Sequence, residues 1–328
     1  MATSGVVEVD PNGDVFLLCG EPDNEVYASP RLKLEASTDD IPIRRSFRVS
    51  SYVLRLASSV FQALLGPRFR EGNELATSAT VEIPLPEDKP EDMEILCSIL
   101  HMRHDQAASV LGTKTIMGFA MLCDKYGCAK AVQPSVELWV RDHLEAAKSY
   151  DLTNYLRAVS LLGYQDSARR VGANLIKEAA GSIVSLVAPD NPRLMSLCAA
   201  LEDLRTGYRQ KLKFIVEDEV DNVLIDKRNG ACNAECPVHL ERLGSFMEQL
   251  RHERLWPCSK QSVCLDDALT AIQDFQAREP DDLVDCHPTN CVKSMGTSLT
   301  EISRDLSRRA LNFRKQVNRF DSIQLKGW

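Results

Sequence analysis

The sequence predicts an α+β N-terminal region followed by an all-α C-terminal region. Three short runs with strand character lie at residues 14–19, 45–49 and 81–85, and alternation of apolar and polar residues is typical of half-buried strands. From residue 90 onward, the apolar residues instead recur three and four positions apart, which is the spacing of a helix that faces a core. We therefore expect a small N-terminal sheet and many helices.

The first 44 residues contain one predicted strand and two segments without a clear pattern. The run from Asp14 to Cys19 is β-prone and follows an Asn-Gly turn pair. Residues 1–12 form a mostly polar N-terminal arm, which either pairs as an edge strand or frays. Residues 21–44 form a long insertion, and a mobile loop is its simplest interpretation. The apolar residues of the arm are Val6, Val7 and Val9.

The stretch from Arg45 to Gly72 organises the N-terminal region, because it predicts a strand, two short helices and a loop. Phe47 and Val49 alternate with polar neighbours. Ser50 or Ser51 can cap the first helix, and a Gly-Pro pair ends the second. We expect the apolar residues of both helices to face inward. They are Val53, Leu54, Leu56 and Ala57 in the first helix, and Val60, Phe61, Leu64 and Leu65 in the second.

Three longer helices are predicted behind the third strand. Pro90 suits the first turn of one helix, where Glu91 and Asp92 are also favoured. The next helix spans Thr113–Tyr126, and the last supplies apolar residues between 132 and 140. Their expected buried faces are Met93, Leu96, Cys97, Ile99 and Leu100; Ile116, Phe119, Ala120, Leu122 and Cys123; and Val132, Val136, Trp139 and Val140.

The order and spacing of these motifs resemble the BTB/POZ domain over residues 13–143. The matching residues are Phe47, Ser50, Val53, Leu54, Ser58 and Phe61 in the central motif, and Asp124, Lys125 and Tyr126 in a later signature. Ser50 keeps the polar character of its position but replaces the His that is frequent in the family, and the chain also departs at residues 101–103, where a Tyr-Thr-Gly type of helix end is usual. The Phe-Arg-Glu-Gly at 69–72 is similar to that of BTB proteins from filamentous fungi.

This resemblance implies a BTB/POZ fold, in which a small sheet is combined with helical hairpins, and a role in protein–protein interaction. Domains of this family self-associate or dock other proteins, and some serve as substrate adaptors of cullin-type ubiquitin ligases. We therefore expect a non-catalytic adaptor or scaffold that forms a homodimer through its first helices and N-terminal segment. A cullin adaptor and a transcription-associated scaffold are the alternatives.

The C-terminal half is expected to be helical throughout. Residues 144–188 form a helical extension that is weakly similar to the BACK-type region behind some BTB domains. Residues 189–192, Pro-Asp-Asn-Pro, are the clearest linker, and residues 193–328 form the C-terminal region. We expect its last helix to pack onto the chain's own helices rather than to form a coiled coil. The predicted helices of this region are 194–223, one that starts at Pro237, 265–275, and one from about Thr297.

Charge and hydropathy argue against nucleic acid and membrane partners. The 328 residues carry a formal net charge of −8 at pH 7, whereas binding to nucleic acid or to anionic lipid depends on positive surface. No apolar run reaches the ~20 residues of a membrane helix, and the first residues lack the features of a secretory signal. A cytoplasmic or nuclear protein is expected. The basic residues of the last helix, expected to be a solvated face, are Arg304, Arg308, Arg309, Arg314, Lys315 and Arg319.

The sequence contains no convincing catalytic set, so an enzyme is not expected. Gly112-Thr113-Lys114-Thr115 lacks the first glycine and the preceding strand of a phosphate-binding loop. It is better explained as the start of a helix capped by Thr113. Several cysteines lie in apolar helical patterns, where cysteine behaves as a small hydrophobic residue.

Two pairs of cysteines in the C-terminal region form a candidate structural zinc site. Each pair lies in a turn-rich segment just before a predicted helix, where close ligands can reach one ion. The alternative is that these residues are free thiols in surface loops. The candidate ligands are Cys232, Cys236, Cys286 and Cys291, with His239 and His287 as spare ligands.

Overall fold

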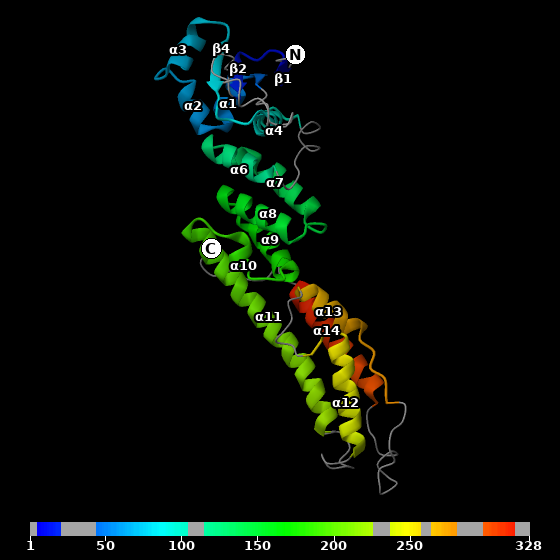
Figure 1. The fold of residues 1–328 in the computed structure, drawn as a ribbon. Coiled ribbons are helices and arrows are strands. Elements are labelled where there is room, and N and C mark those ends of the chain that lie inside the picture. The colour runs from blue at the N-terminus through cyan, green and yellow to red at the C-terminus, as the bar shows by residue number, and fades with distance from the viewer. Residues whose placement is uncertain are drawn as a thin grey trace, which may run out of the picture. The chain divides into compact units, whose positions relative to one another are not determined.

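The chain divides into two compact units, Met1–Val171 and Gly172–Trp328. The division falls inside the predicted helical extension, 144–188, and not at the predicted linker. Among the described residues the first unit is α+β and the second is helical (Figure 1). The computed structural model describes residues 5–20, 44–103, 115–225, 237–256, 264–280 and 298–318.

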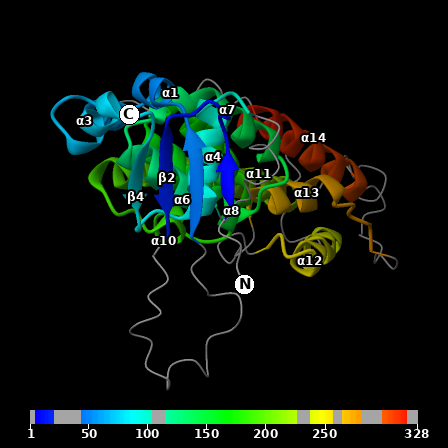
Figure 2. The ribbon, with the colours of Figure 1, turned by 90° about the horizontal axis from the view of Figure 1, so that it is seen from above.

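The first unit contains a mixed four-stranded sheet in the order β1-β3-β2-β4 (Figure 2). Strand β2 runs antiparallel to β3 and parallel to β4, and β1 runs parallel to β3. Leu17 lies opposite both Phe47 and Ile83, and all three are buried, so the alternation predicted from the sequence is confirmed. The strands are β1 (Val6–Glu8), β2 (Val15–Cys19), β3 (Arg45–Val49) and β4 (Val81–Leu85).

Helix α4 (Pro90–Leu100) is the central helix of the first unit. It contacts β3, α1, α6 and α7, and nine of its residues are buried. The predicted buried faces of α4, α6 and α7 are confirmed. The other helices of this unit are α1 (Ser51–Ala57), α2 (Ser59–Leu64), α3 (Arg70–Thr77), α6 (Ile116–Lys125), α7 (Ala129–His143) and α8 (Ser149–Leu162), and α9 (Gln165–Glu178) crosses the division.

The predicted inward face of the first two helices is wrong at Leu56 and Val60, which are both exposed. Helix α1 has only seven residues, which is just under two turns, and Leu54 is its only fully buried side chain. Ser58 then ends α1 in an extended conformation. Helix α2 therefore starts on a new axis and buries Phe61.

A third short helix, α3, replaces the loop that was predicted behind α2. Its Gly72 lies so close to the preceding turn that an added Cβ would be 2.0 Å from the carbonyl oxygen of Gly66. Only glycine permits such an approach of two backbone segments. This contact explains the glycine of the Phe-Arg-Glu-Gly segment by packing.

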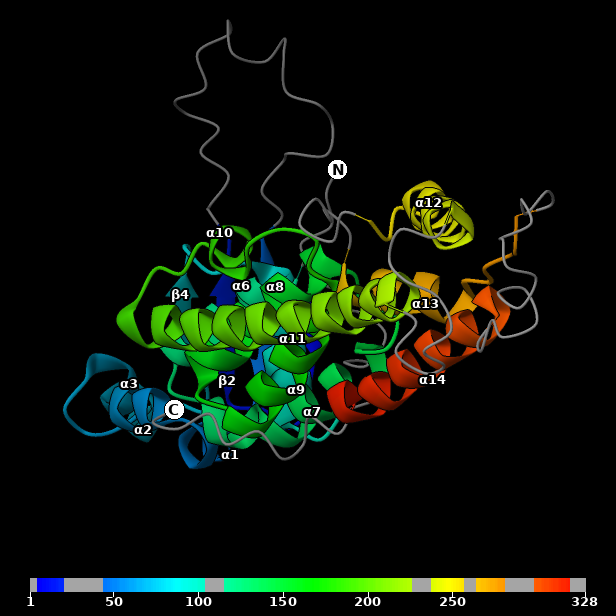
Figure 3. The same ribbon diagram turned by 90° about the horizontal axis from the view of Figure 1, so that it is seen from below.

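The second unit contains α11 (Pro192–Ile225), which runs unbroken for 34 residues (Figure 3) and is about 51 Å long at 1.5 Å per residue. Helix α14 (Leu299–Asn318) contacts α11 and α13, so the expected packing onto the chain's own helices is confirmed. None of the described helices is long and apolar enough to cross a membrane. The remaining helices are α10 (Ile183–Val187), α12 (Pro237–His252) and α13 (Leu265–Asp274).

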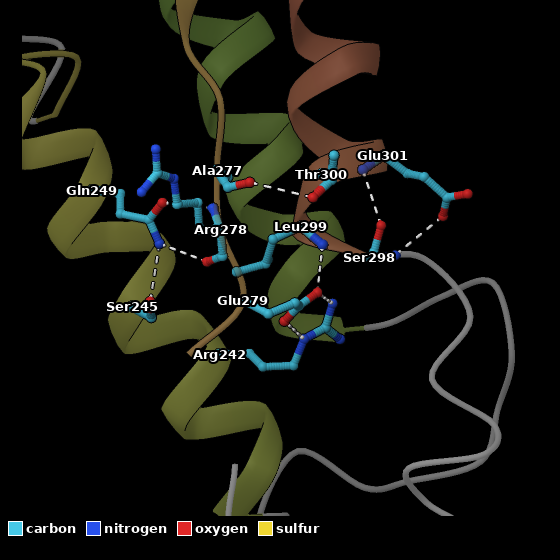
Figure 4. A network of polar contacts seen from close by, with 10 residues as sticks. All are labelled: Arg242, Ser245, Gln249, Ala277, Arg278, Glu279, Ser298, Leu299, Thr300 and Glu301. Atoms are coloured by element: carbon cyan, nitrogen blue, oxygen red, sulfur yellow. Dashed lines mark hydrogen bonds and ion pairs between the residues drawn. The ribbon is translucent and has the colours of Figure 1, made fainter. Parts of the chain in front are cut away.

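A polar network fixes the segment behind α13 between α12 and α14 (Figure 4). Glu279 accepts hydrogen bonds from Arg242 at 3.0 and 3.1 Å and from the backbone N–H of Leu299 at 2.7 Å. The Arg242 side chain is only 4% exposed. The Gln249 amide donates to the carbonyl of Arg278 and accepts from its N–H, both at 2.8 Å. The Gln249 side chain of α12 thus supplies the hydrogen-bond partners that the Arg278 backbone would otherwise find in a neighbouring strand.

Glu279→Ala is expected to lower the free energy of unfolding by about 2 kcal/mol. Hydrogen bonds to charged groups contribute roughly 1.5–3 kcal/mol, and the substitution removes a bidentate partner from a buried guanidinium. Urea denaturation of the full chain, followed by circular dichroism, measures the loss. The control is Glu248→Ala, which removes an exposed carboxylate from α12. Equal losses in the two variants would contradict the prediction.

Candidate protein-interaction surface

Helix α1 exposes two large apolar side chains on one face. Tyr52 is 75% exposed and Leu56 is 78% exposed. Residues four positions apart on a helix are neighbours, so these two side chains form one patch, called the α1 face here. Large contiguous apolar patches mark sites that bind another protein, and this pair supplies two side chains to such a surface.

Strand β1 provides a second candidate contact. It lies at one edge of the sheet, with β3 as its only partner strand among the described residues, and Val6 is half exposed. The N-terminal arm therefore pairs as an edge strand over residues 6–8, which decides between the two possibilities that the sequence left open. An edge strand presents backbone N–H and C=O groups that can pair with another chain.

Two side chains from outside α1 fix its N-terminus. The Asp14 carboxylate accepts from the backbone N–H and from the hydroxyl of Ser51, both at 2.7 Å. His101 accepts from the N–H of Ser50 through Nε2 at 3.0 Å, and its Nδ1 donates to the Cys97 carbonyl at 2.9 Å. The predicted cap is therefore wrong in part, because Asp14 rather than the Ser50 side chain caps this helix.

The hydrogen bonds of His101 require the neutral imidazole, since a protonated ring has no acceptor nitrogen. Burial lowers the pKa of His101, which favours this neutral form. His101 is the first of residues 101–103, which depart from the BTB/POZ pattern. Its side chain positions the start of α1.

The residues predicted as the core motif are brought together beneath the surface. Ser58 caps α2 by accepting from the N–H of Phe61 at 2.9 Å, and its hydroxyl donates to the carbonyl of Tyr126. The rings of Phe61 and Tyr126 are stacked with centroids 4.6 Å apart. The Tyr126 hydroxyl donates to Asp88, which also pairs with Lys125 at 2.7 Å.

These motif residues position the surface and do not form it. Phe47, Leu54, Ser58, Phe61 and Tyr126 are buried, and Val53 is half-buried. Sequence reasoning missed the α1 face, because it assigned Leu56 to the core and did not consider Tyr52. The signal that could have found it is the four-residue spacing of these two side chains in a helix too short to bury them.

The candidate zinc ligands Cys232, Cys236, Cys286, Cys291 and His287 lie outside the described residues, and so does the side chain of His239. Within the described ranges, no cluster of histidine, cysteine, aspartate or glutamate is arranged to hold a metal ion. The described cysteines are free and buried; they are Cys19, Cys97, Cys123, Cys128, Cys198 and Cys264.

The structural zinc site stays a prediction from the sequence. We expect metal analysis of dialysed protein to give about one zinc per chain, and Cys232→Ser with Cys236→Ser to abolish it. Cys198→Ser, which removes a buried thiol of α11, is the control and should retain the metal. A zinc content well below one per chain in the wild type would refute the site.

No family model matches this chain, and no curated protein or solved structure matches it. The resemblance to the BTB/POZ domain therefore depends on the motif residues and on the order of the elements around them.

Proposed function

We propose that this chain is a non-catalytic protein–protein interaction protein, and that its N-terminal unit forms a homodimer through the α1 face and the β1 edge. The observation that carries the proposal is the exposure of Tyr52 and Leu56 on a helix whose own position is fixed by Asp14 and His101. A rigid apolar patch loses little conformational entropy when it binds.

The order of elements in the first unit supports the same proposal. Strands β2 and β3, three short helices, strand β4 and the buried helix α4 follow one another. The BTB/POZ resemblance implies the same order with two short helices, so α3 is an addition to it. That resemblance also implies a role as an adaptor for partners such as a cullin. Affinity purification from the native cell tests this narrower proposal, because recovery of a cullin would support it.

The charges of α14 favour protein rather than nucleic acid as the partner. Arg309 pairs with Asp218 and Glu219 at 2.7 and 2.5 Å. Arg314 pairs with Asp266, and Arg308 with Asp305, both at 2.7 Å. Arginines whose charge is compensated within the chain contribute less to the basic stripe that phosphate binding needs.

Leu56→Glu is expected to dissociate the homodimer. Each dimer would lose two buried leucines worth about 1.5–3 kcal/mol each, so the dissociation constant should rise at least about 100-fold. Light scattering at several concentrations should give twice 36.6 kDa for the wild type and the monomer mass for the variant.

The matched control is Leu138→Glu on α7, because Leu138 is also an exposed leucine, at 46%, but does not belong to the α1 face. It should leave the mass unchanged. A wild-type chain that is monomeric at high micromolar concentration, or a Leu56→Glu variant that remains dimeric, would refute the proposal.

A further inference from the structure

A small hollow lined by three acidic and two basic residues lies in the first unit between the N-terminus of α4 and one side of α6. Its volume is about 220 Å³. Clefts that bind small molecules are usually larger, roughly 300–1,000 Å³, so this hollow has the size for a single side chain. Its lining includes Glu87, Lys89, Asp92, Gly118, Met121 and Leu122.

The carboxylate of Asp92 is one of the charged groups that line this hollow. The residue is only 7% exposed, and it has no hydrogen-bond or ion-pair partner among the described residues. Burial raises the pKa of Asp92 to about 6, while the nearby Lys89 acts in the opposite direction. The carboxylate is therefore mostly ionised at neutral pH, and a buried unpaired charge is costly unless a counter-charge meets it.

Gly118 keeps this carboxylate accessible. An added Cβ at position 118 would lie 2.5 Å from Oδ2 of Asp92, which is too close for any side chain there to leave the carboxylate in place. Helix α6 thus has its smallest residue at the point where Asp92 faces it.

Among the other charges around the hollow, Lys89 is positive and exposed, and Asp88 and Lys125 compensate each other. Asp88 pairs with Lys125 at 2.7 Å and accepts a hydrogen bond from the Tyr126 hydroxyl. Lys125 is therefore already paired with Asp88 and not with Asp92. Glu87 adds a further negative charge to the lining, and Met121 and Leu122 add apolar wall. A basic side chain offers the matching pair of features, a cationic end and an apolar stem.

We propose that this hollow receives a lysine or arginine side chain of a partner protein, with the cationic end against Asp92 and the stem against Met121 and Leu122. The inference rests on the proposed function in that it takes the partner to be a protein. It adds a contact that is separate from the α1 face.

Titration of the full chain with short blocked peptides, followed by NMR, tests this contact. Ac-Gly-Lys-Gly-NH₂ and Ac-Gly-Arg-Gly-NH₂ should shift the amide signal of Gly118 and the methyl signal of Met121 at millimolar concentrations. The norleucine peptide, which keeps the stem and lacks the charge, should not. Asp92→Asn should weaken binding at least about tenfold, the equivalent of one charge-assisted hydrogen bond.

Two further variants make the test specific. Gly118→Ala should weaken binding similarly, because it displaces the carboxylate, whereas Glu82→Gln removes an exposed charge of β4 and should change little. Equal binding of the norleucine peptide, undiminished binding by Asp92→Asn, or no shift with either basic peptide would overturn the proposal. Tighter binding of Mg²⁺ than of the peptides at the same signals would overturn it in favour of a metal ion.

Peptide titration of the Leu56→Glu variant tests the hollow separately from the proposed homodimer. Peptide binding by a monomeric Leu56→Glu chain would support the hollow independently of the dimer. Loss of peptide binding in that variant, with Asp92 unchanged, would overturn the claim that the two contacts are separate.

Discussion

Phe61→Ala is expected to lower the free energy of unfolding by about 3–5 kcal/mol, the usual cost of removing a buried phenylalanine ring. Phe61 is fully buried, and its ring stacks on Tyr126 with an interplanar angle of 2°. The substitution removes this stack and leaves a cavity beneath α2. Chemical denaturation followed by circular dichroism measures the loss.

Gln62→Ala is the control for Phe61→Ala, because Gln62 is the exposed neighbour in the same helix. It should change the free energy of unfolding by no more than about 0.5 kcal/mol, as is usual for surface positions. A loss below about 1 kcal/mol for Phe61→Ala would show that the cavity collapses or that the ring contributes little to the core.

Asp92→Asn is expected to stabilise the protein at pH 7 by about 2–3 kcal/mol. The pKa of Asp92 is about 6 in the folded chain and roughly 3.9 in an unfolded one. The folded chain therefore holds a proton that the unfolded chain has lost between pH 4 and pH 6. Stability from this group is present below about pH 4 and falls as the pH rises through about 6.

The difference in the free energy of unfolding between the wild type and Asp92→Asn, measured as a function of pH, isolates Asp92 from all other titrating groups. It should be small near pH 3.5 and should grow to its full value by about pH 7, at about 1.4 kcal/mol for each unit of pKa shift. Glu82→Gln, which removes an exposed carboxylate of β4, should show no such dependence. A difference that stays constant over this range would mean that Asp92 titrates normally.

The sequence predicted the longer elements well, because their apolar spacing repeats over several turns. The buried faces of α4, α6 and α7 were all correct. It was wrong for α1, where seven residues give too little periodicity to orient a helix and where the break at Ser58 resets the axis. The cap of α1 was missed because Asp14 reaches Ser51 across 37 positions, and local patterns carry no information on such contacts.

Local sequence patterns also fail to predict the long-range contacts of the candidate sites. Asp92 was assigned to the favourable first turn of its helix, which is correct, but only packing against α6 shows that its carboxylate is buried at Gly118. The Arg242–Glu279 pair likewise joins residues 37 positions apart. Charged residues are usually exposed, so neither burial could be inferred from residue type.

The hydroxyl of Ser58 has a consequence for the time at which a nascent chain could form the proposed homodimer. It joins the end of α1 to the carbonyl of Tyr126, 68 positions later. Synthesis adds roughly 5–20 residues per second, so about 3–14 s pass between the two residues on the ribosome. During that interval the helix that bears Tyr52 and Leu56 lacks its distal anchor. A nascent chain thus completes the set of anchors beneath its apolar patch only after Tyr126 has been made, which in the proposed homodimer would limit premature contact between neighbouring nascent chains.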